Sequence, residues 1–478
     1  MSHHSDEIAY LPAHELVARY RARELSPVEV TAALLERTEQ LNPSLNAIVT
    51  VTAEGARAQA REAEAAYREG RADGRPLLGV PFTVKDNIPV QGVRTTMGSL
   101  LSADAVPDTS APTVERSLAA GGVLLGKSNT PEYGWKGETT NRVFGSTYNP
   151  WNLELTPGGS TGGGAAAVAA GLGPLALGTD GGGSIRIPAA FSGLFGYKAS
   201  FGVIPVVPNG SLETLPHVGV LARTVRDGAL YAGVVAGPDA RDRLSLNDSG
   251  LDFEGCLDRG VEGFRIAWSP DLGYAAVEPE ILAIVAPAAH ALAEAGAVVE
   301  EVELDFEDPY PIFDVLFSAA MGGPHAKNFE EVRHLIDFGR VAVVEAALRM
   351  TAADVGHALI QRWRWYEQMR RLMERYDLLL TPTLPLTAFK AGLDRPETVA
   401  GRPVEGLSWS PFTYPLNLTG QPACSVPAGL TRAGLPVGLQ IVGGWRGDEA
   451  VLRAAAAFEA VRPWQQLRPP LDGVSAPA

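Results

Sequence analysis

The sequence predicts an α/β protein with a largely parallel, buried β-sheet. The main observation is that helical and strand patterns alternate from about residue 77 onward, an order typical of parallel strands joined by helices. The second is composition, because 46% of the 478 residues are apolar and 20% are charged, as in globular proteins and unlike disordered chains. A chain of this length can form one large body or two to three modules.

The first 75 residues are predicted to be helical. The segment 26–29, Ser-Pro-Val-Glu, has the pattern of a capping box with proline at the first helical position, and apolar residues then recur at helical spacing. We expect this helix to end near Asn42-Pro43 and a second, alanine-rich helix to cover Ala53 to Arg68. A turn at 73–76 separates that helix from the apolar run Leu77 to Val84, the first strand candidate.

Helices and strands alternate beyond this point, with a polar stretch at 240–250 that is either a boundary or a surface loop. Residues 305–375 are helical in pattern and rich in aromatic residues, methionine and arginine. The expected elements are helices at 112–120, 164–170, 278–295 and 448–461, and strands at 123–126, 175–177, 264–268, 298–304, 423–426 and 437–442.

Charge and residue usage exclude several classes of protein. The net charge of −15 and pI of about 5.1 disfavour a nucleic-acid or anionic-membrane binder, because phosphate would be repelled. Two cysteines cannot build a disulfide framework, and the eight histidines show no metal-binding motif, so we expect neither a metal nor another cofactor. The acidic N-terminus lacks a signal-peptide pattern and no apolar run reaches the roughly 20 residues of a membrane span. We expect a soluble, cytoplasmic protein.

The densest glycine cluster, residues 157–188, predicts two glycine-rich turns that face one another across an alanine-rich helix. Each turn carries one serine, Ser160 and Ser184. Glycine permits positive φ and lets several backbone N–H groups converge, which is how proteins build an oxyanion cradle. The alternative is structural, with glycines that allow close packing and serines that cap helices. Two such turns so close together favour the functional interpretation.

Lys85 is the second candidate, since it stands at the end of an apolar strand. Desolvation disfavours the ammonium form and can turn a lysine into a base near neutral pH. The alternative is a lysine paired with Asp86.

Two other motif matches are not supported by their surroundings. The segment 121–128 has the residue pattern of a phosphate-binding loop, but an apolar strand occupies the supposed loop. The segment 158–162 matches the nucleophile elbow of α/β-hydrolases without the preceding strand.

Together with their surroundings these residues resemble the amidase signature family of serine hydrolases, which includes aryl acylamidases and the amidase subunit of tRNA-dependent amidotransferases. The similarity covers nearly the whole chain and its motifs are highly specific. They are LLGVPFTVKDNI (77–88), GKSNTPEYGW (126–135), FGSTYNPWN (144–152), the segment from PGGSTGGG to GLFGYK (157–198), LARTVRDGALYAGVVAGPD (221–239), FTYPLNLTGQPACSVPAG (412–429) and GLPVGLQIVGG (434–444).

The resemblance implies a large mixed, mostly parallel sheet surrounded by helices and a Ser-cisSer-Lys triad. By motif position Ser184 is the nucleophile, Ser160 the bridging serine and Lys85 the base, while the N–H groups of Gly181, Gly182, Gly183 and Ser184 line the oxyanion hole. The family usually has serines where this chain has Thr161 and Gly164, and threonine where it has Gly181.

We therefore expect one amidase domain over 1–478. It comprises an N-terminal helical part (1–75), a catalytic core (76–240), a variable substrate-pocket region (241–400) and C-terminal strands with a closing helix (401–478). The expected activity is hydrolysis of a carboxylic amide with aryl or apolar groups. The pocket candidates are the aromatic residues Trp135, Phe144, Tyr310, Phe313, Phe317 and Trp409.

Alternatives remain open at this point. The same triad could cleave carbamates or esters, and the chain could be the amidase subunit of a tRNA-dependent amidotransferase. An α/β-hydrolase with Ser160 as nucleophile and a non-catalytic binding protein are less consistent with the motifs. The expected partner is a small-molecule amide, not nucleic acid or membrane. Because members of the family are often dimers, a homodimer is one state open to the chain.

Overall fold

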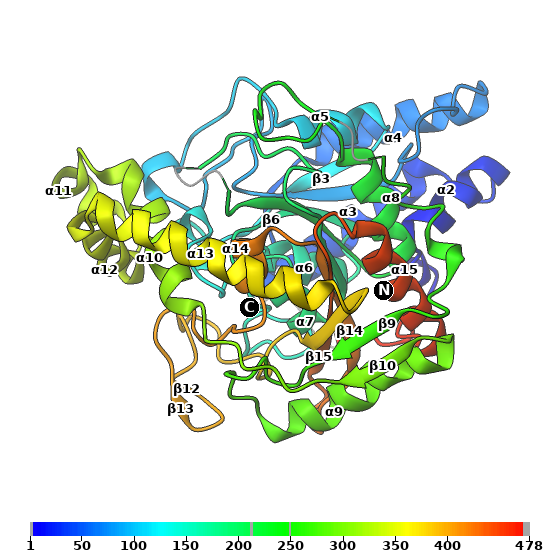
Figure 1. Cartoon of the computed structure of the whole chain (residues 1–478). Helices are drawn as coiled ribbons and strands as arrows, with labels where there is room; N and C mark the ends of the chain where they lie inside the picture. The colour runs from blue at the N-terminus through cyan, green and yellow to red at the C-terminus, as the bar shows by residue number, and fades with distance from the viewer. Residues whose placement is uncertain (1–2, 211–213, 248–249, 472–478) are drawn as a thin grey trace.

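The computed structural model describes residues 3–210, 214–247 and 250–471. Its centre is an 11-stranded β-sheet with helices packed around it (Figure 1). The strand order is β1-β3-β2-β6-β8-β7-β14-β15-β11-β9-β10. The bounds of these strands are β1 Ile48–Val51, β2 Pro81–Lys85, β3 Val123–Ser128, β6 Leu175–Asp180, β7 Phe195–Lys198, β8 His217–Ala222, β9 Arg265–Trp268, β10 Val298–Glu301, β11 Leu378–Pro382, β14 Ala423–Leu430 and β15 Pro436–Gly443. Two small hairpins pair β4 Thr140–Asn141 with β5 Gly145–Ser146 and β12 Thr398–Val399 with β13 Arg402–Pro403.

The sheet is mixed and surrounded by helices, as predicted. Parallel pairing joins β3, β2 and β6 at one side, and β11, β9 and β10 at the other. Between these blocks the pairing is antiparallel, a larger share than the alternation of helices and strands indicated. One reason is that β8 inserts between β6 and β7 and runs opposite to both. Another is that a short turn joins β14 directly to β15, which allows only antiparallel pairing.

The helices agree closely with the predicted segments, and α4 and α15 have the predicted bounds. The helix predicted to end near residues 42–43 continues to Leu45. Pro43 sits in its last turn, where the bond from Asn46 N–H to the Asn42 carbonyl still forms. The bounds are α1 His3–Ala9, α2 Ala13–Ala22, α3 Pro27–Leu45, α4 Ala53–Arg68, α5 Pro112–Ala119, α6 Gly162–Ala169, α7 Arg186–Ser192, α8 Val225–Val235, α9 Pro279–His290, α10 Tyr310–Gly322, α11 Phe329–Val332, α12 Phe338–Arg349, α13 Ala352–Met373, α14 Pro415–Thr419 and α15 Asp448–Val461.

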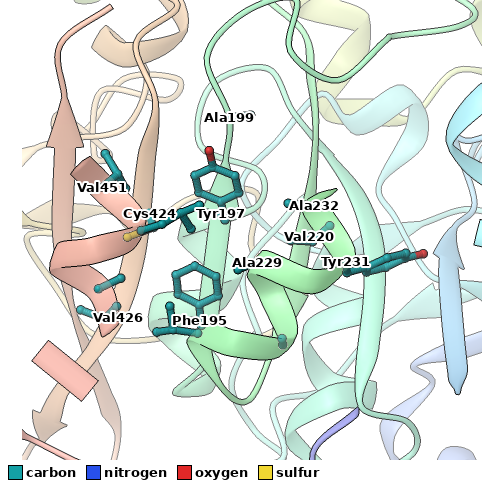
Figure 2. Close-up of a cluster of buried hydrophobic side chains, with 14 of the residues drawn as sticks. Phe195, Tyr197, Ala199, Val220, Ala229, Tyr231, Ala232, Cys424, Val426 and Val451 are labelled. Carbon is teal, nitrogen blue, oxygen red and sulfur yellow. The ribbon is translucent and has the colours of Figure 1, made fainter. Parts of the chain in front are cut away.

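The main hydrophobic core lies where the centre of the sheet meets α8 and α15. Figure 2 shows Phe195 and Tyr197 of β7 close to Ala229 of α8 and Cys424 of β14. The Tyr197 hydroxyl donates to Asp448 at 2.6 Å, so the one polar atom of this aromatic side chain is satisfied inside the core. Strands from residues 48 to 443 share one sheet, and the strands at its centre contribute to this main core.

The segment 305–375 is helical, as predicted, and forms α10 to α13. Figure 1 shows α10, α11 and α12 gathered at one edge of the molecule, with α13 crossing in front of the sheet. α10 packs against both α12 and α13. In the described ranges, no helix is long and apolar enough to cross a membrane. This helical layer forms one wall of the pocket described next.

Candidate active site

The ends of two adjacent parallel strands place the first polar groups of the site. β2 ends at Lys85 and pairs with β6, whose last residues are Thr179 and Asp180. The Lys85 Nζ atom lies 2.6 Å from Ser160 Oγ and 2.8 Å from Thr179 Oγ1. The amide of Asn87 also donates to Thr179 Oγ1, at 3.1 Å. The lysine and the first serine singled out in the sequence are thus in direct contact.

Lys85 is completely buried. Burial lowers its pKa from 10.5 to about 7, since the ammonium loses its water shell, and the negative charge of Asp180 only partly opposes this shift. A lysine with this pKa is substantially uncharged at neutral pH. The alternative interpretation, pairing with the neighbouring Asp86, does not hold, because Asp86 lies 3.6 Å from a different lysine, Lys127.

The two glycine-rich turns do face one another. Thr161 N–H donates to the Ser184 carbonyl at 3.1 Å, which ties one turn to the other. The Gly159–Ser160 peptide bond is cis. Neither serine caps a helix, because the cap positions of α6 and α7 are Thr161 and Ile185. Ser160 and Ser184 instead line the same cavity.

The Ser184 turn is held from below by the carboxylate of Asp180. This carboxylate accepts hydrogen bonds from Gly183 N–H at 2.8 Å and Ile185 N–H at 3.1 Å, and from two nitrogens of Arg186. All of these groups are buried, and Asn417 donates to the same carboxylate at 2.9 Å. Burial alone would raise the pKa of Asp180, but the Arg186 guanidinium holds it well below its usual range. A permanent anion therefore organises the backbone around Ser184.

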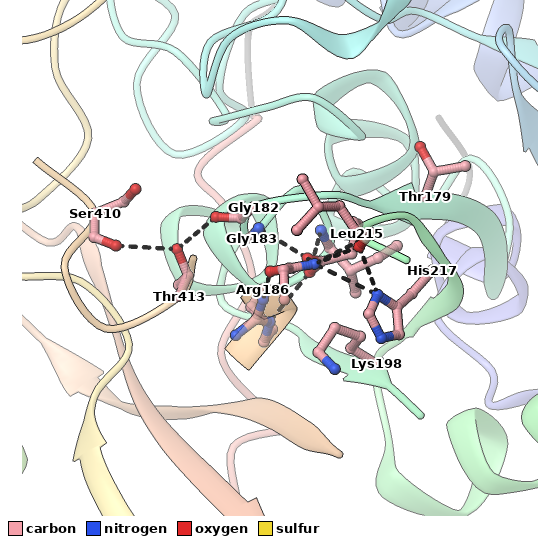
Figure 3. A network of polar contacts seen from close by, with 12 residues as sticks. Thr179, Gly182, Gly183, Arg186, Lys198, Leu215, His217, Ser410 and Thr413 are labelled. Atoms are coloured by element: carbon pink, nitrogen blue, oxygen red, sulfur yellow. Dashed lines mark hydrogen bonds and ion pairs between the residues drawn. The ribbon is translucent and has the colours of Figure 1, made fainter. Parts of the chain in front are cut away.

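The four residues assigned to the oxyanion hole differ in their hydrogen bonds and in their surroundings. Gly183 N–H points to Asp180, so in this geometry it is occupied rather than free to meet an oxyanion. The Gly182 carbonyl accepts a hydrogen bond from Thr413 at 2.8 Å, which fixes the orientation of the peptide that follows it (Figure 3). Gly181 and Ser184 line the cavity. A Cβ atom at Gly181 would meet nothing within 4 Å, so glycine leaves open space beside the nucleophile turn.

The cavity has a volume of about 370 Å³ and its walls come from distant parts of the chain. Residues 206, 208–210, 215 and 216, which lie between β7 and β8, form one wall, and α10 with Arg340 of α12 forms another. Apolar side chains predominate. The lining comprises Asn87, Met97, Tyr133, Gly134, Ser160, Thr179, Gly181, Ser184, Val206, Pro208, Asn209, Gly210, Leu215, Pro216, Phe317, Ala320, Met321, Pro324 and Arg340.

Of the six aromatic residues predicted to line the pocket, Phe317 does so. Phe313 stacks behind it at 5.1 Å between ring centroids and backs the Gly182 peptide instead. Trp409 stacks on Phe191 in a separate core cluster. The remaining three, which pack against other groups outside the cavity lining, are Trp135 beside Lys136, Phe144 beside Arg94, and Tyr310 beside Tyr414. The sequence supplied aromatic character but not the direction in which each ring points.

Most residues of the pocket wall were missed by sequence reasoning, and Tyr133 and Arg340 are two of them. Tyr133 lies within the motif GKSNTPEYGW (126–135), next to Gly134, where an added Cβ would come within 2.9 Å of Ser160 Oγ. Arg340 opens α12 and lies 156 positions beyond Ser184 in the chain. Its role in the cavity has no local sequence signal. The described residues contain no group of three histidine, cysteine, aspartate or glutamate side chains that could hold a metal ion.

Comparison with known proteins shows the family of this chain. Residues 29–452 match the family model described as Amidase. The chain is 40% identical to an acylamidase of Rhodococcus erythropolis, with 96% of this chain and 97% of that protein covered. The chain belongs to the amidase signature family. It is thus an enzyme of a family that hydrolyses the C–N bonds of amides.

Other members of the amidase signature family are similar over equally long stretches. A glutamyl-tRNA(Gln) amidotransferase subunit of Roseiflexus castenholzii is 36% identical, with 97% of each chain covered. Among solved structures, a bacterial aryl acylamidase of this family superimposes with a TM-score of 0.89 at 33% identity, covering 96% of this chain and 97% of that one. A 6-aminohexanoate cyclic dimer hydrolase gives 0.87 at 30% identity, covering 97% and 99%. These similarities fix the family and the fold together.

Proposed function

We propose that this amidase hydrolyses linear carboxylic amides through an acyl-enzyme on Ser184, with Lys85 as the base acting through Ser160. The observation that carries the proposal is the 2.6 Å contact between Lys85 Nζ and Ser160 Oγ at the rim of a cavity that Ser184 also lines. A serine hydroxyl is a weak nucleophile unless its proton has an acceptor. A buried lysine with a pKa of about 7 is such an acceptor.

The reaction then runs in two halves. In the first, the Ser184 hydroxyl oxygen attacks the amide carbonyl while its proton passes to Ser160, and the Ser160 proton passes to neutral Lys85. The tetrahedral intermediate collapses with cleavage of the C–N bond, and the leaving amine takes a proton back along the same relay. In the second half, water attacks the acyl-enzyme, gives up a proton by the same route and releases the carboxylic acid.

The oxyanion of the tetrahedral intermediate needs fixed donors on the opposite side of the carbonyl. The turn at residues 181–184 is held rigid by Asp180 below and by Thr413 at the side, so its peptides need no rearrangement during the reaction. We assign the donors to backbone N–H groups of this turn other than that of Gly183, which is engaged by Asp180. A preorganised donor of this kind contributes about 3–4 kcal/mol to transition-state binding.

The cavity supports a preference for aryl or apolar groups. Met97, Val206, Leu215, Phe317 and Met321 present hydrocarbon or thioether surface to the substrate space. Apolar walls with a few polar groups are typical of sites that bind drug-sized organic molecules. The names of two relatives, an acylamidase and an aryl acylamidase, point the same way.

The proposal is tested with a small hydrolysis panel on the purified enzyme and on Ser184→Ala. The panel contains an aliphatic primary amide, acetanilide, an aryl carbamate, an aryl ester and glutamine. We expect hydrolysis of acetanilide by the wild type and none above background by the variant, with unchanged circular dichroism. Full activity of Ser184→Ala would overturn the assignment of the nucleophile. Carbamate or ester turnover at higher rates would identify the alternative leaving group.

A second candidate function follows from the amidotransferase relatives, one of which is 36% identical to this chain. Such a protein would release ammonia from glutamine within a complex. Hydrolysis of glutamine in preference to every other member of the panel would favour this function. Turnover of acetanilide by the isolated chain, with glutamine inert, would exclude it.

A further inference from the structure

Arg340 is a buried cation in the pocket wall that the proposed mechanism does not use. It is the third residue of α12 and its side chain is only 1% exposed, yet it lines the cavity that contains Ser160 and Ser184. Burying a guanidinium is costly unless its charge and its N–H groups find partners. Its contacts therefore show what it is placed to do.

Part of the guanidinium is satisfied by the protein. Nη2 donates to the Met321 carbonyl at 3.0 Å and lies 3.1 Å from His325 Nε2. Nη1 lies 3.3 Å from a carboxylate oxygen of Glu132, and the Tyr133 ring covers Cζ at 4.7 Å from its centroid. These contacts hold the plane of the guanidinium in one orientation at the cavity.

The remaining N–H groups are unsatisfied. Within the described residues, neither Nε nor Nη1 of Arg340 has a hydrogen-bond acceptor in suitable geometry, and the contact of Nη1 with Glu132 is an ion pair without a hydrogen bond. A buried donor without an acceptor costs as much as a lost hydrogen bond, and nearly all such groups in proteins are paired. Both nitrogens have almost no exposed surface, but Arg340 borders the cavity, so a small shift of its side chain would bring them to an acceptor on a bound molecule, which would supply the missing partner.

The charge balance around Arg340 decides which acceptor fits. Glu132 compensates the positive charge and is itself fixed by Ser99 Oγ at 2.6 Å and by Asp337 N–H at 2.9 Å. His325 adds no charge near neutral pH, because burial and then Arg340 lower its pKa. The group is therefore close to neutral as a whole. A group without net charge does not offset the cost of removing water from a carboxylate. It therefore favours an uncharged acceptor.

The rest of the lining points to the same class of substrate. In the described part of the lining, no aspartate or glutamate is present to bind an α-ammonium group, and Arg340 is the one charged side chain. A free amino acid such as glutamine would have to bury both of its charges against apolar walls. This favours the acylamidase function over glutamine hydrolysis.

Resting on the function proposed above, we propose that Arg340 is a specificity residue that selects amides carrying an uncharged acceptor oxygen, such as a carbonyl, ether or nitro oxygen, away from the scissile bond. The acceptor completes the hydrogen bonding of the guanidinium, and Glu132 keeps the pair selective for neutral groups. Tyr133 packs over the guanidinium and fixes its direction.

The test uses matched substrates that differ in one group. Para-acetyl and para-isopropyl anilides have similar shapes, and only the first carries an acceptor oxygen on its substituent. A second pair of substrates carries the same two groups on the benzoyl ring of a benzamide. We expect the acetyl-to-isopropyl ratio of kcat/KM for one of the two pairs to fall by about tenfold in Arg340→Met, mainly through KM, because a hydrogen bond from a charged donor is lost. The electronic effect of the substituent is the same in both enzymes and cancels in this comparison.

Three further variants keep the test decisive. Glu132→Gln retains Arg340 but removes the compensating charge, so kcat/KM for a para-carboxylate substrate should rise about tenfold relative to the acetyl substrate. If Arg340→Met does not fold, Arg340→Lys is used instead. It keeps the charge but loses the planar, bidentate guanidinium, so it should lower the acetyl-to-isopropyl ratio of kcat/KM. Arg142→Met is the matched control, since Arg142 contacts the ring of Phe338 at the start of α12 but does not line the cavity.

The outcomes separate the two proposals. Hydrolysis of unsubstituted acetanilide tests the proposed function alone. If the wild type does not hydrolyse it, both the proposed function and the role of Arg340 are contradicted. Hydrolysis of acetanilide with the same acetyl-to-isopropyl ratio in wild type, Arg340→Met and Arg340→Lys would overturn the role of Arg340 and leave the amidase function in place. A loss of selectivity in Arg142→Met equal to that in Arg340→Met would also overturn it.

Discussion

The pH dependence of catalysis is the sharpest consequence of the buried lysine. If Lys85 is the base, only its neutral form accepts the proton, so kcat/KM should increase tenfold per pH unit below 7 and level off above it. Burial lowers the pKa of Lys85 from 10.5 to about 7. A shift of this size corresponds to about 5 kcal/mol of lost stabilisation of the ammonium form, at 1.36 kcal/mol per pH unit.

The size of the effect follows from the fraction of neutral lysine. At pH 7.5 a pKa of about 7 leaves roughly three quarters of the lysine neutral, against about 0.1% for an unperturbed lysine. Burial therefore supplies roughly 750 times more free base at this pH. The assay is the initial rate of acetanilide hydrolysis between pH 5 and 10, at substrate concentrations well below KM. Lys85→Met should lower the plateau value of kcat/KM by about 100- to 10,000-fold.

Two other buried lysines provide matched controls. Burial lowers the pKa of Lys198 to about 7 and that of Lys127 to about 8, yet neither contacts Ser160. Lys198→Met and Lys127→Met should keep the midpoint of the profile near 7, whatever they do to stability. A midpoint near 10 in the wild type, or a midpoint that moves in Lys198→Met, would refute the assignment of Lys85 as the titrating base.

Three further predictions concern the turn that carries the nucleophile. Arg186→Met leaves the buried Asp180 carboxylate without its main counter-charge and should lower the free energy of unfolding by about 3–5 kcal/mol in urea denaturation; an unchanged midpoint would contradict this. In Gly182→Ala the new Cβ would lie 2.6 Å from Phe313 Cζ, so we expect about 1–3 kcal/mol of destabilisation and a lower kcat, with recovery of both in Gly182→Ala/Phe313→Leu. Gly181→Thr fills open space at the cavity and should raise KM for bulky anilides about tenfold while sparing acetamide, as steady-state kinetics would show.

Local pattern was sufficient for most elements of the fold. The alanine-rich helix at 53–68 and the closing helix at 448–461 appear with the predicted bounds, because their helical periodicity is long and their ends carry clear signals. The strand directions in the centre of the sheet were less predictable. The insertion of β8 between β6 and β7 is a pairing between segments distant in sequence, which local alternation does not encode.

The sequence by itself indicated the candidate catalytic residues that depend on local backbone features. Lys85 at the end of an apolar strand and a serine in each of two glycine-rich turns could be recognised because glycine spacing and strand ends are local features. Tertiary structure alone decided the contacts that depend on packing. It turned Phe317 toward the cavity and Phe313 behind the Gly182 peptide. It brought Asn417 onto the Asp180 carboxylate, and it placed Arg340 in the wall of the cavity that the two serines line, since these positions follow from how helices far along the chain pack against the sheet.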